Sequence, residues 1–388
     1  MEPAIPPSRD EMLALTSALT RLDTVNPPGN EQLVADHLAE LVGGSGIDAE
    51  VIELSDGRAN LEMTWPGTGD APALLYCGHF DTVPLGDRPW SNDPHGALFD
   101  GEYLWGRGTV DMKGGVAAMV LAMMSFAQSG LRFPGDIRFL GTIGEEVDCA
   151  GARAALGREV LADIGNLVIS EPTGMNLAVA HKGAMFVELS TVGKSAHAAM
   201  ADQGISAIAN MIELLANVTG IDWEVKTHSV LGPPSLVVGT IEGGSVVNLV
   251  PDSCSAQIDI RTVPGIDHDR LLAQLESIVD EARSSIPDFE GSLRLFGDYP
   301  AVGVDPEDPL VSAAQATLTD LGKTDAALTS VAYFSDGSII QPPTGVPTLL
   351  CGPGDPNLAH QTDEKVHINE LELAGQFYTA LPNQVFRT

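Results

Sequence analysis

The chain has 388 residues, of which 44% are hydrophobic, so it is long enough to form two domains with substantial cores. Its 53 acidic and 20 basic residues give a formal net charge of −33 at pH 7. This balance argues against nucleic acid and anionic membrane surfaces as partners, because both attract clustered Lys and Arg. Such acidity is typical of a very soluble or salt-adapted protein.

The sequence predicts a cytoplasmic protein. Residues 1–12 contain neither a basic segment nor an apolar stretch, so we expect no signal peptide. The longest apolar run, residues 116–127, is too short to cross a membrane. Four scattered cysteines without a C-x-x-C pair favour a reduced protein over a disulfide scaffold.

Periodicity and turn residues predict an α/β domain in the first half of the chain. Predicted helices cover residues 10–22, 31–41 and 111–127, and predicted strands cover 49–54, 60–65, 74–77, 136–143 and 166–170. Residues 85–109 read as a long irregular loop, a kind of loop that is commonly functional. Alternating strands and helices indicate a mixed, mostly parallel sheet with helices on both faces.

A second domain is predicted inside the first. Strands are expected at 185–191, 235–241, 253–261 and 291–295, and helices at 205–218 and 268–284. This β-α-β-β-α-β order is typical of a ferredoxin-like α+β domain. We therefore assign residues 182–295 to an insert and residues 1–181 and 296–388 to the first domain, which resumes with a helix at 309–321, a strand at 347–351 and a helix at 369–381.

Histidines and acidic residues recur where the predicted strands of the first domain end. They are His79 and Asp81, Glu145 and Glu146, Glu171 and His360, with Asp111 at the start of a helix. In an open α/β sheet, ligands bind outside the carboxyl ends of the strands, so these side chains could meet at one place. Two imidazoles and several carboxylates suit zinc or a similar divalent ion, and one carboxylate can bridge two ions.

Each of these residues also has an ordinary structural explanation when it is considered alone. A single histidine commonly packs in the core, a Glu-Glu pair commonly lies in a solvated loop, and Asp111 would suit a helix N-terminus. Their recurrence at successive strand ends favours a metal site. Glu145 and Glu146 point in different directions, so one can bind metal while the other accepts a proton from an activated water. This combination indicates a hydrolase.

Further motifs run through nearly the whole chain. They are GHFDTVP (78–84), LWGRGTVDMKGG (104–115), TIGEE (142–146), SEPT (170–173), GKSAHAA (193–199), VVNLVPD (246–252), DIR (259–261), FSDGS (334–338) and AHQTDE (359–364). In this order they resemble the M20 family of metal-dependent peptidases and deacylases. That family includes acetylornithine deacetylase, succinyl-diaminopimelate desuccinylase and glutamate carboxypeptidase.

The resemblance implies two metal ions bridged by Asp111. It assigns His79 and Glu171 to one ion and Glu146 and His360 to the other. Asp81 would hydrogen-bond His79 and orient it. Glu145 would act as general base and acid.

The resemblance also implies a homodimer, with the insert as its dimerisation or lid domain. His197 would reach the active site of the partner subunit and stabilise the tetrahedral oxyanion, with help from Asn248. Arg261 would bind a substrate carboxylate through its planar guanidinium. Ser335, in the FSDGS motif, would also contact the substrate.

The expected activity is hydrolysis of a linear amide bond that removes an acyl group from an N-acyl amino acid. The expected cofactors are two divalent ions, with zinc favoured over cobalt or manganese. The alternative within the family is a carboxypeptidase or dipeptidase that cleaves a small peptide. An inactive relative that serves as a scaffold, or a metal store, belongs to a different class. Both conflict with a complete set of ligands beside an acid-base glutamate.

Overall fold

The structure is a computed structural model that describes residues 4–387. These residues divide into two compact units. The larger unit contains residues 4–180, 303–331 and 335–387, and the smaller unit contains residues 181–302 and 332–334. Among the described residues, no helix is both long and apolar enough to cross a membrane.

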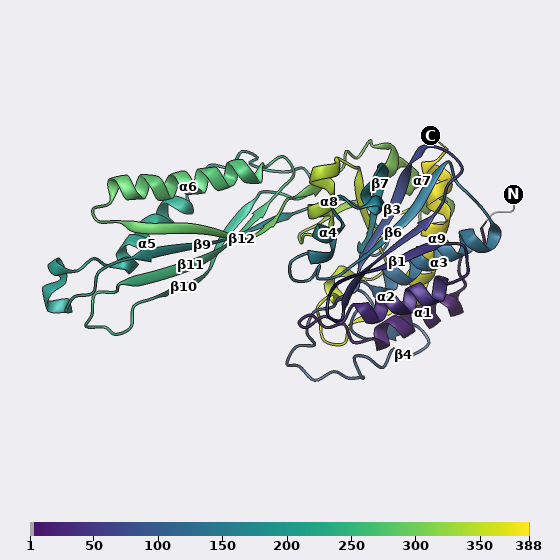
Figure 1. The fold of residues 1–388 in the computed structure, drawn as a ribbon, viewed down its shortest axis with the longest axis horizontal. Coiled ribbons are helices and arrows are strands. Elements are labelled where there is room, and N and C mark those ends of the chain that lie inside the picture. The colour runs from purple at the N-terminus through teal and green to yellow at the C-terminus, as the bar shows by residue number, and fades with distance from the viewer. Residues whose placement is uncertain (1–3, 388) are drawn as a thin grey trace. The chain divides into compact units, whose positions relative to one another are not determined.

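A mixed sheet forms the centre of the larger unit (Figure 1). Its strand order is β1-β2-β6-β3-β7-β15-β8-β13, and β14 pairs with β8. The bounds are β1 (Asp48–Ser55), β2 (Arg58–Trp65), β3 (Ala71–His79), β6 (Gly135–Thr142), β7 (Ile164–Pro172), β8 (Leu177–His181), β13 (Val302–Gly303), β14 (Leu328–Val331) and β15 (Thr348–Gly352). The central strands β6, β3, β7 and β15 are parallel, whereas β1, β2 and β8 pair antiparallel. The predicted mixed, mostly parallel sheet is confirmed.

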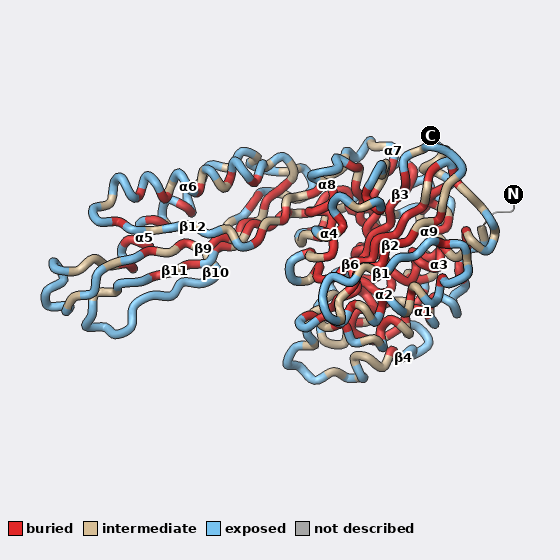
Figure 2. Tube along the Cα trace, in the orientation of Figure 1, coloured by how far each residue is buried: buried red, intermediate tan, exposed pale blue. Residues whose placement is uncertain are grey.

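Helices flank this sheet, as predicted. They are α1 (Arg9–Arg21), α2 (Gln32–Val42), α3 (Lys113–Ser129), α4 (Ala150–Ala155), α7 (Pro309–Asp320), α8 (Gly337–Thr344) and α9 (Ile368–Val385). Helix α3 packs on β2, β3, β6 and β7, and α1 and α9 pack on α3. Because α3 is covered by strands and by other helices, it is apolar almost all round. Figure 2 shows the buried residues gathered along these central strands.

The structure corrects two predictions for the larger unit and adds a helix that was not predicted. Helix α3 begins at Lys113, so Asp111 lies in the preceding loop and does not open the helix. The predicted irregular loop 85–109 contains β4 (Leu98–Phe99) and β5 (Tyr103–Trp105), which pair with each other and with β16 (Lys365–His367). Helix α8 was not predicted, because its two prolines argue against a helix.

The smaller unit has the predicted β-α-β-β-α-β order. Its elements are β9 (Gly183–Val192), α5 (Ala207–Val218), β10 (Ser235–Gly243), β11 (Ser253–Thr262), α6 (His268–Ser285) and β12 (Glu290–Tyr299), with the short helix η2 (Ala198–Gln203) after β9. The strands form an antiparallel sheet in the order β10-β11-β9-β12. Apolar residues that alternate along β9 and β11 pack against α5 and α6 and form the core of this unit.

Candidate metal centre

The predicted ligands lie at one edge of the central sheet. His79 is the last residue of β3, and Glu171 lies in the last two residues of β7. Glu146 follows β6 by four residues, and His360 lies in the loop after β15. Because these four strands are parallel, their carboxyl ends meet at the same edge.

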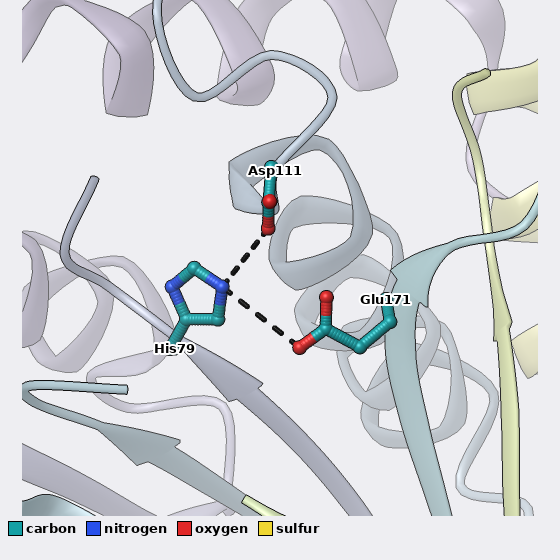
Figure 3. Close-up of side chains that lie close together, drawn as sticks. All are labelled: His79, Asp111 and Glu171. Atoms are coloured by element: carbon teal, nitrogen blue, oxygen red, sulfur yellow. Dashed lines mark hydrogen bonds and ion pairs between the residues drawn. The ribbon is translucent and has the colours of Figure 1, made fainter. Parts of the chain in front are cut away.

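One group of potential ligands consists of His79, Asp111 and Glu171 (Figure 3). The Nε2 atom of His79 lies 3.0 Å from Oδ1 of Asp111 and 3.9 Å from Oε1 of Glu171. One ligand atom from each residue falls within 4.8 Å of the other two. His79 and Glu171 are buried, with 1% and 3% of their surface exposed.

A second group consists of Asp111, Glu146 and His360, again with ligand atoms within 4.8 Å of one another. Nε2 of His360 lies 3.3 Å from Oδ2 of Asp111 and 3.1 Å from Oε2 of Glu146. Asp111 therefore presents one carboxylate oxygen to each group. Each group offers one imidazole nitrogen and two carboxylates, which is a donor set that fits a divalent ion, and the shared carboxylate fits a bridging ligand.

The proximity of so many acidic groups changes their protonation. Burial, with repulsion from neighbouring carboxylates, raises the pKa of Glu171 well above its usual value and also raises the pKa of Glu146. Hydrogen bonds to Asp111 and Glu146 raise the pKa of His360 to about 10. Without another cation, the cluster thus retains protons on groups that would bind metal in their deprotonated form.

Glu145 lies beside the first group but belongs to neither. Its Oε2 is 4.0 Å from Nε2 of His79, and the residue is 6% exposed. Burial is the largest of the causes that raise its pKa well above the usual value. In the metal-free protein, this burial favours the protonated form of the Glu145 carboxyl group.

The structure corrects the predicted contact of Asp81. Nδ1 of His79 lies 2.9 Å from the backbone oxygen of Asp81 but 3.6 Å from its carboxylate oxygen Oδ1, so the hydrogen bond involves the backbone. The carboxylate instead accepts the backbone N–H groups of Glu145 and Glu146, at 3.2 and 3.3 Å. Asp81 therefore holds both the imidazole and the turn that carries the glutamate pair.

His197 and Asn248 lie on adjoining segments of the smaller unit. The backbone N–H of Ala198 donates to the backbone oxygen of Asn248 at 3.0 Å. Both residues are exposed. Nδ1 of His197 accepts the backbone N–H of Ala199 at 3.1 Å, so a neutral imidazole carries its proton on Nε2.

Arg261 and Ser335 are occupied by local contacts. The guanidinium of Arg261 pairs with Asp259 at 2.8 Å, within the smaller unit. Ser335, in the larger unit, is 0% exposed, and its Oγ accepts the backbone N–H of Gly337 at 3.2 Å. This placement favours a structural role for the Ser335 hydroxyl over the predicted substrate contact.

Two residues near the candidate centre were not singled out from the sequence. The side-chain amide of Asn26 donates to the carboxylate of Asp81 at 2.9 Å. Asp336 is 1% exposed and accepts a hydrogen bond from Oγ1 of Thr142 at 2.5 Å. The sequence did contain an indication for Asp336. This acidic residue lies in the FSDGS motif, directly before a short apolar segment that is buried in the structure.

The comparison with known families agrees with this geometry. Residues 75–384 match Peptidase family M20/M25/M40, which is most of the chain. The chain belongs to this family. The M20 resemblance of the sequence motifs is therefore confirmed, and the protein is a hydrolase of the M20 type.

Relatives cover nearly the full length of this M20 protein. A probable succinyl-diaminopimelate desuccinylase of Staphylococcus aureus (strain MRSA252) is 28% identical over 92% of this chain and 93% of its own length. The acetylornithine deacetylase of Proteus mirabilis is 29% identical over 93% of this chain and 91% of its own. Among solved structures, an aminopeptidase of Bacillus cereus shares the fold with a TM-score of 0.79 and 23% identity, covering 97% of this chain and 99% of that one.

Proposed function

We propose that this M20 protein is a dimetal amide hydrolase that removes the acyl group from an N-acyl amino acid. The observation that carries the proposal is the carboxylate of Asp111, whose two oxygens face His79 at 3.0 Å and His360 at 3.3 Å. His79, Asp111 and Glu171 would hold one ion, and Asp111, Glu146 and His360 the other. Zinc is the favoured metal, because imidazole and carboxylate ligands suit it.

Two bound ions would polarise the substrate carbonyl and activate a water molecule as the nucleophile. Glu145 would accept the proton of that water and transfer it to the nitrogen of the leaving amine. Its position supports this role, because Glu145 is buried beside His79 but belongs to neither ligand group, so its carboxylate is not needed to hold an ion. Asp81 would hold Glu145 in place through the backbone N–H.

The smaller unit would contribute to binding. His197 would donate its Nε2–H to the oxyanion that develops in the active site of the partner subunit, with Asn248 beside it. The tautomer set by the N–H of Ala199 supports this assignment. Arg261 would exchange its contact with Asp259 for the substrate carboxylate.

A homodimer and a cytoplasmic location remain part of the proposal. Strand β10 is an edge of the antiparallel sheet and exposes Val237 and Ile241, with 58% and 52% of their surface accessible. An exposed apolar edge strand supports pairing with a second copy. Light scattering of the purified protein would give twice the 40.7 kDa chain mass if the proposal holds.

The names of the relatives favour a deacylase, whereas the fold of the aminopeptidase favours a peptidase as the second candidate. A hydrolysis panel separates them: N-succinyl, N-acetyl and N-formyl amino acids against dipeptides and tripeptides, each with zinc, cobalt or manganese. We expect release of a free amino acid from at least one acyl substrate. Cleavage of peptides alone would establish the second candidate, and no cleavage of any amide would refute both.

A further inference from the structure

A buried ion pair lies beside the loop that carries Asp111. Arg107 and Glu364 are 2% and 0% exposed, and Nη1 of Arg107 donates to Oε2 of Glu364 at 2.6 Å. The free energy needed to remove two charges from water is about as large as the free energy gained from their attraction. A buried ion pair therefore need not stabilise the fold. Its other contacts indicate a second role.

The second oxygen of Glu364 binds the backbone at Asp111. Oε1 accepts the N–H of Val110 at 2.8 Å and the N–H of Asp111 at 3.2 Å. Hydrogen bonds to an ionised acceptor are about twice as strong as neutral ones. The Glu364 carboxylate therefore fixes the two peptide groups that directly precede the Cα of Asp111, whose carboxylate is shared by the two ligand groups.

Arg107 extends this connection to the segments that follow the two histidines. Its Nη2 donates to the backbone oxygen of Pro84 at 3.1 Å, five residues after His79. Its Nη1 also approaches the backbone oxygen of Gln361 at 3.4 Å, directly after His360. The ion pair thus joins the backbone of three segments, and each of them carries a candidate ligand.

We propose that Glu364, held by Arg107, is a positioning residue that keeps Asp111 between the two ligand groups; this inference rests on the proposed dimetal function. Asp111 must face both His79 and His360, at 3.0 and 3.3 Å. A displacement of its carboxylate towards one imidazole lengthens the distance to the other. Anchoring the two successive peptide groups that lead into Asp111 restrains that displacement.

The substitution Glu364→Gln tests the proposal, because it keeps the volume of the side chain and removes its charge. Metal-free protein is titrated with zinc ions in the presence of a competing chelator. We expect both zinc equivalents to bind about 10- to 100-fold more weakly, which is the usual effect of losing a residue that orients a ligand. His360→Ala provides the contrast, since it should weaken one equivalent far more than the other.

Glu62→Gln is the matched control. Glu62 also forms an ion pair with an arginine in the larger unit, Arg158, and its side chain is 10% exposed. It lies on β2 and has no contact with a candidate ligand among its hydrogen bonds and ion pairs. This variant should melt at a lower temperature and keep the zinc affinity of the wild type, which separates positioning from stability.

A double variant provides the test if Glu364→Gln alone does not fold. Arg107→Gln with Glu364→Gln removes both buried charges, so it should fold even if the single variant does not, and its zinc affinity should stay reduced. Wild-type affinity for both ions in a folded Glu364 variant would overturn the positioning role, and so would weakening confined to one ion. If the wild-type protein took up no zinc, the dimetal proposal itself would fail, and the positioning role with it.

Discussion

At the scale of single residues, two adjacent glutamates have different surroundings. Asp81 accepts the backbone N–H of both, so their Cα positions are fixed together. Their side chains then diverge: the Glu146 carboxylate lies 3.1 Å from His360, whereas the Glu145 carboxylate lies 4.0 Å from His79. The sequence predicted that one would bind metal and one would transfer protons, and the geometry is consistent with that division.

Replacing each glutamate by glutamine should therefore have a different result. Glu145→Gln should lower kcat by about 10²- to 10⁴-fold, the usual contribution of an acid-base group, and should keep two metal equivalents. Glu146→Gln should lose one equivalent and the activity together. Metal analysis and steady-state kinetics of the two purified variants measure both effects. A Glu145→Gln variant with normal kcat would contradict the proposed mechanism.

The buried carboxyl group of Asp336, near the candidate centre, destabilises the folded protein when it is ionised. Burial raises the pKa of its carboxyl group to about 6, although a hydrogen bond from Thr142 acts in the opposite direction. The folded pKa lies above the unfolded one, so the contribution of this group to stability is complete below about pH 4 and is lost as the pH rises through about 6. Above that pH the folded protein holds a buried charge.

The substitution Asp336→Asn should remove this cost. At pH 8 the free energy of unfolding of the metal-free protein should rise by on the order of 1–3 kcal/mol, because a shift of one pKa unit corresponds to about 1.4 kcal/mol. At pH 4 the variant and the wild type should be nearly equal. Urea unfolding at both pH values measures the difference. An equal gain at both pH values would attribute the effect to packing.

At the scale of elements, the candidate centre depends on how closely α3 lies on β7. A Cβ atom placed on Gly115 would lie 2.0 Å from Oγ of Ser170 and 2.7 Å from its backbone oxygen. Gly115 is in the first turn of α3, shortly after Asp111, and Ser170 directly precedes Glu171. This contact between helix and strand therefore sets the separation of two candidate ligands.

Gly115→Ala should separate the helix from the strand. Alanine favours helix formation by about 1 kcal/mol over glycine, yet the overpacking should lower stability by about 1–3 kcal/mol and weaken zinc binding. Gln128→Ala, at an exposed position of the same helix, is the control and should change neither property. Thermal melting and zinc titration of both variants test this, and tighter zinc binding in Gly115→Ala would contradict it.

At the scale of the whole molecule, the charge of −33 dominates the electrostatics. We expect NaCl to raise the melting temperature, because salt screens the repulsion between acidic side chains. The distance over which two charges interact falls from about 10 Å at 0.1 M salt to about 3 Å at 1 M. Melting curves of the metal-free protein at 0.05 M and 1 M NaCl measure this effect. A protein that melted at a lower temperature in 1 M NaCl would show that salt bridges outweigh the net repulsion.

Much of the molecule could be predicted from local patterns. Apolar runs that end at or just before His79, Glu145 and Glu171 indicate both the parallel strands and residues of the candidate centre, because an apolar strand and the polar residues after it lie within a short stretch of sequence. The β-α-β-β-α-β order of the insert is local in the same way. Helix α8 was missed because Pro342 and Pro343 argue against a helix, although the burial of Ile339 and Ile340 favours one.

The identity of the candidate ligands and the order of the main elements were determined by the sequence itself, since each depends on residues that are neighbours in the chain. Tertiary structure decided the rest. It showed that Asp111 precedes α3 and faces two groups, that Asp81 holds the glutamate turn through its carboxylate, and that Glu364 anchors the Asp111 backbone from 253 residues away. Such contacts depend on distances between segments far apart in sequence, which are set only when the sheet and its helices pack together.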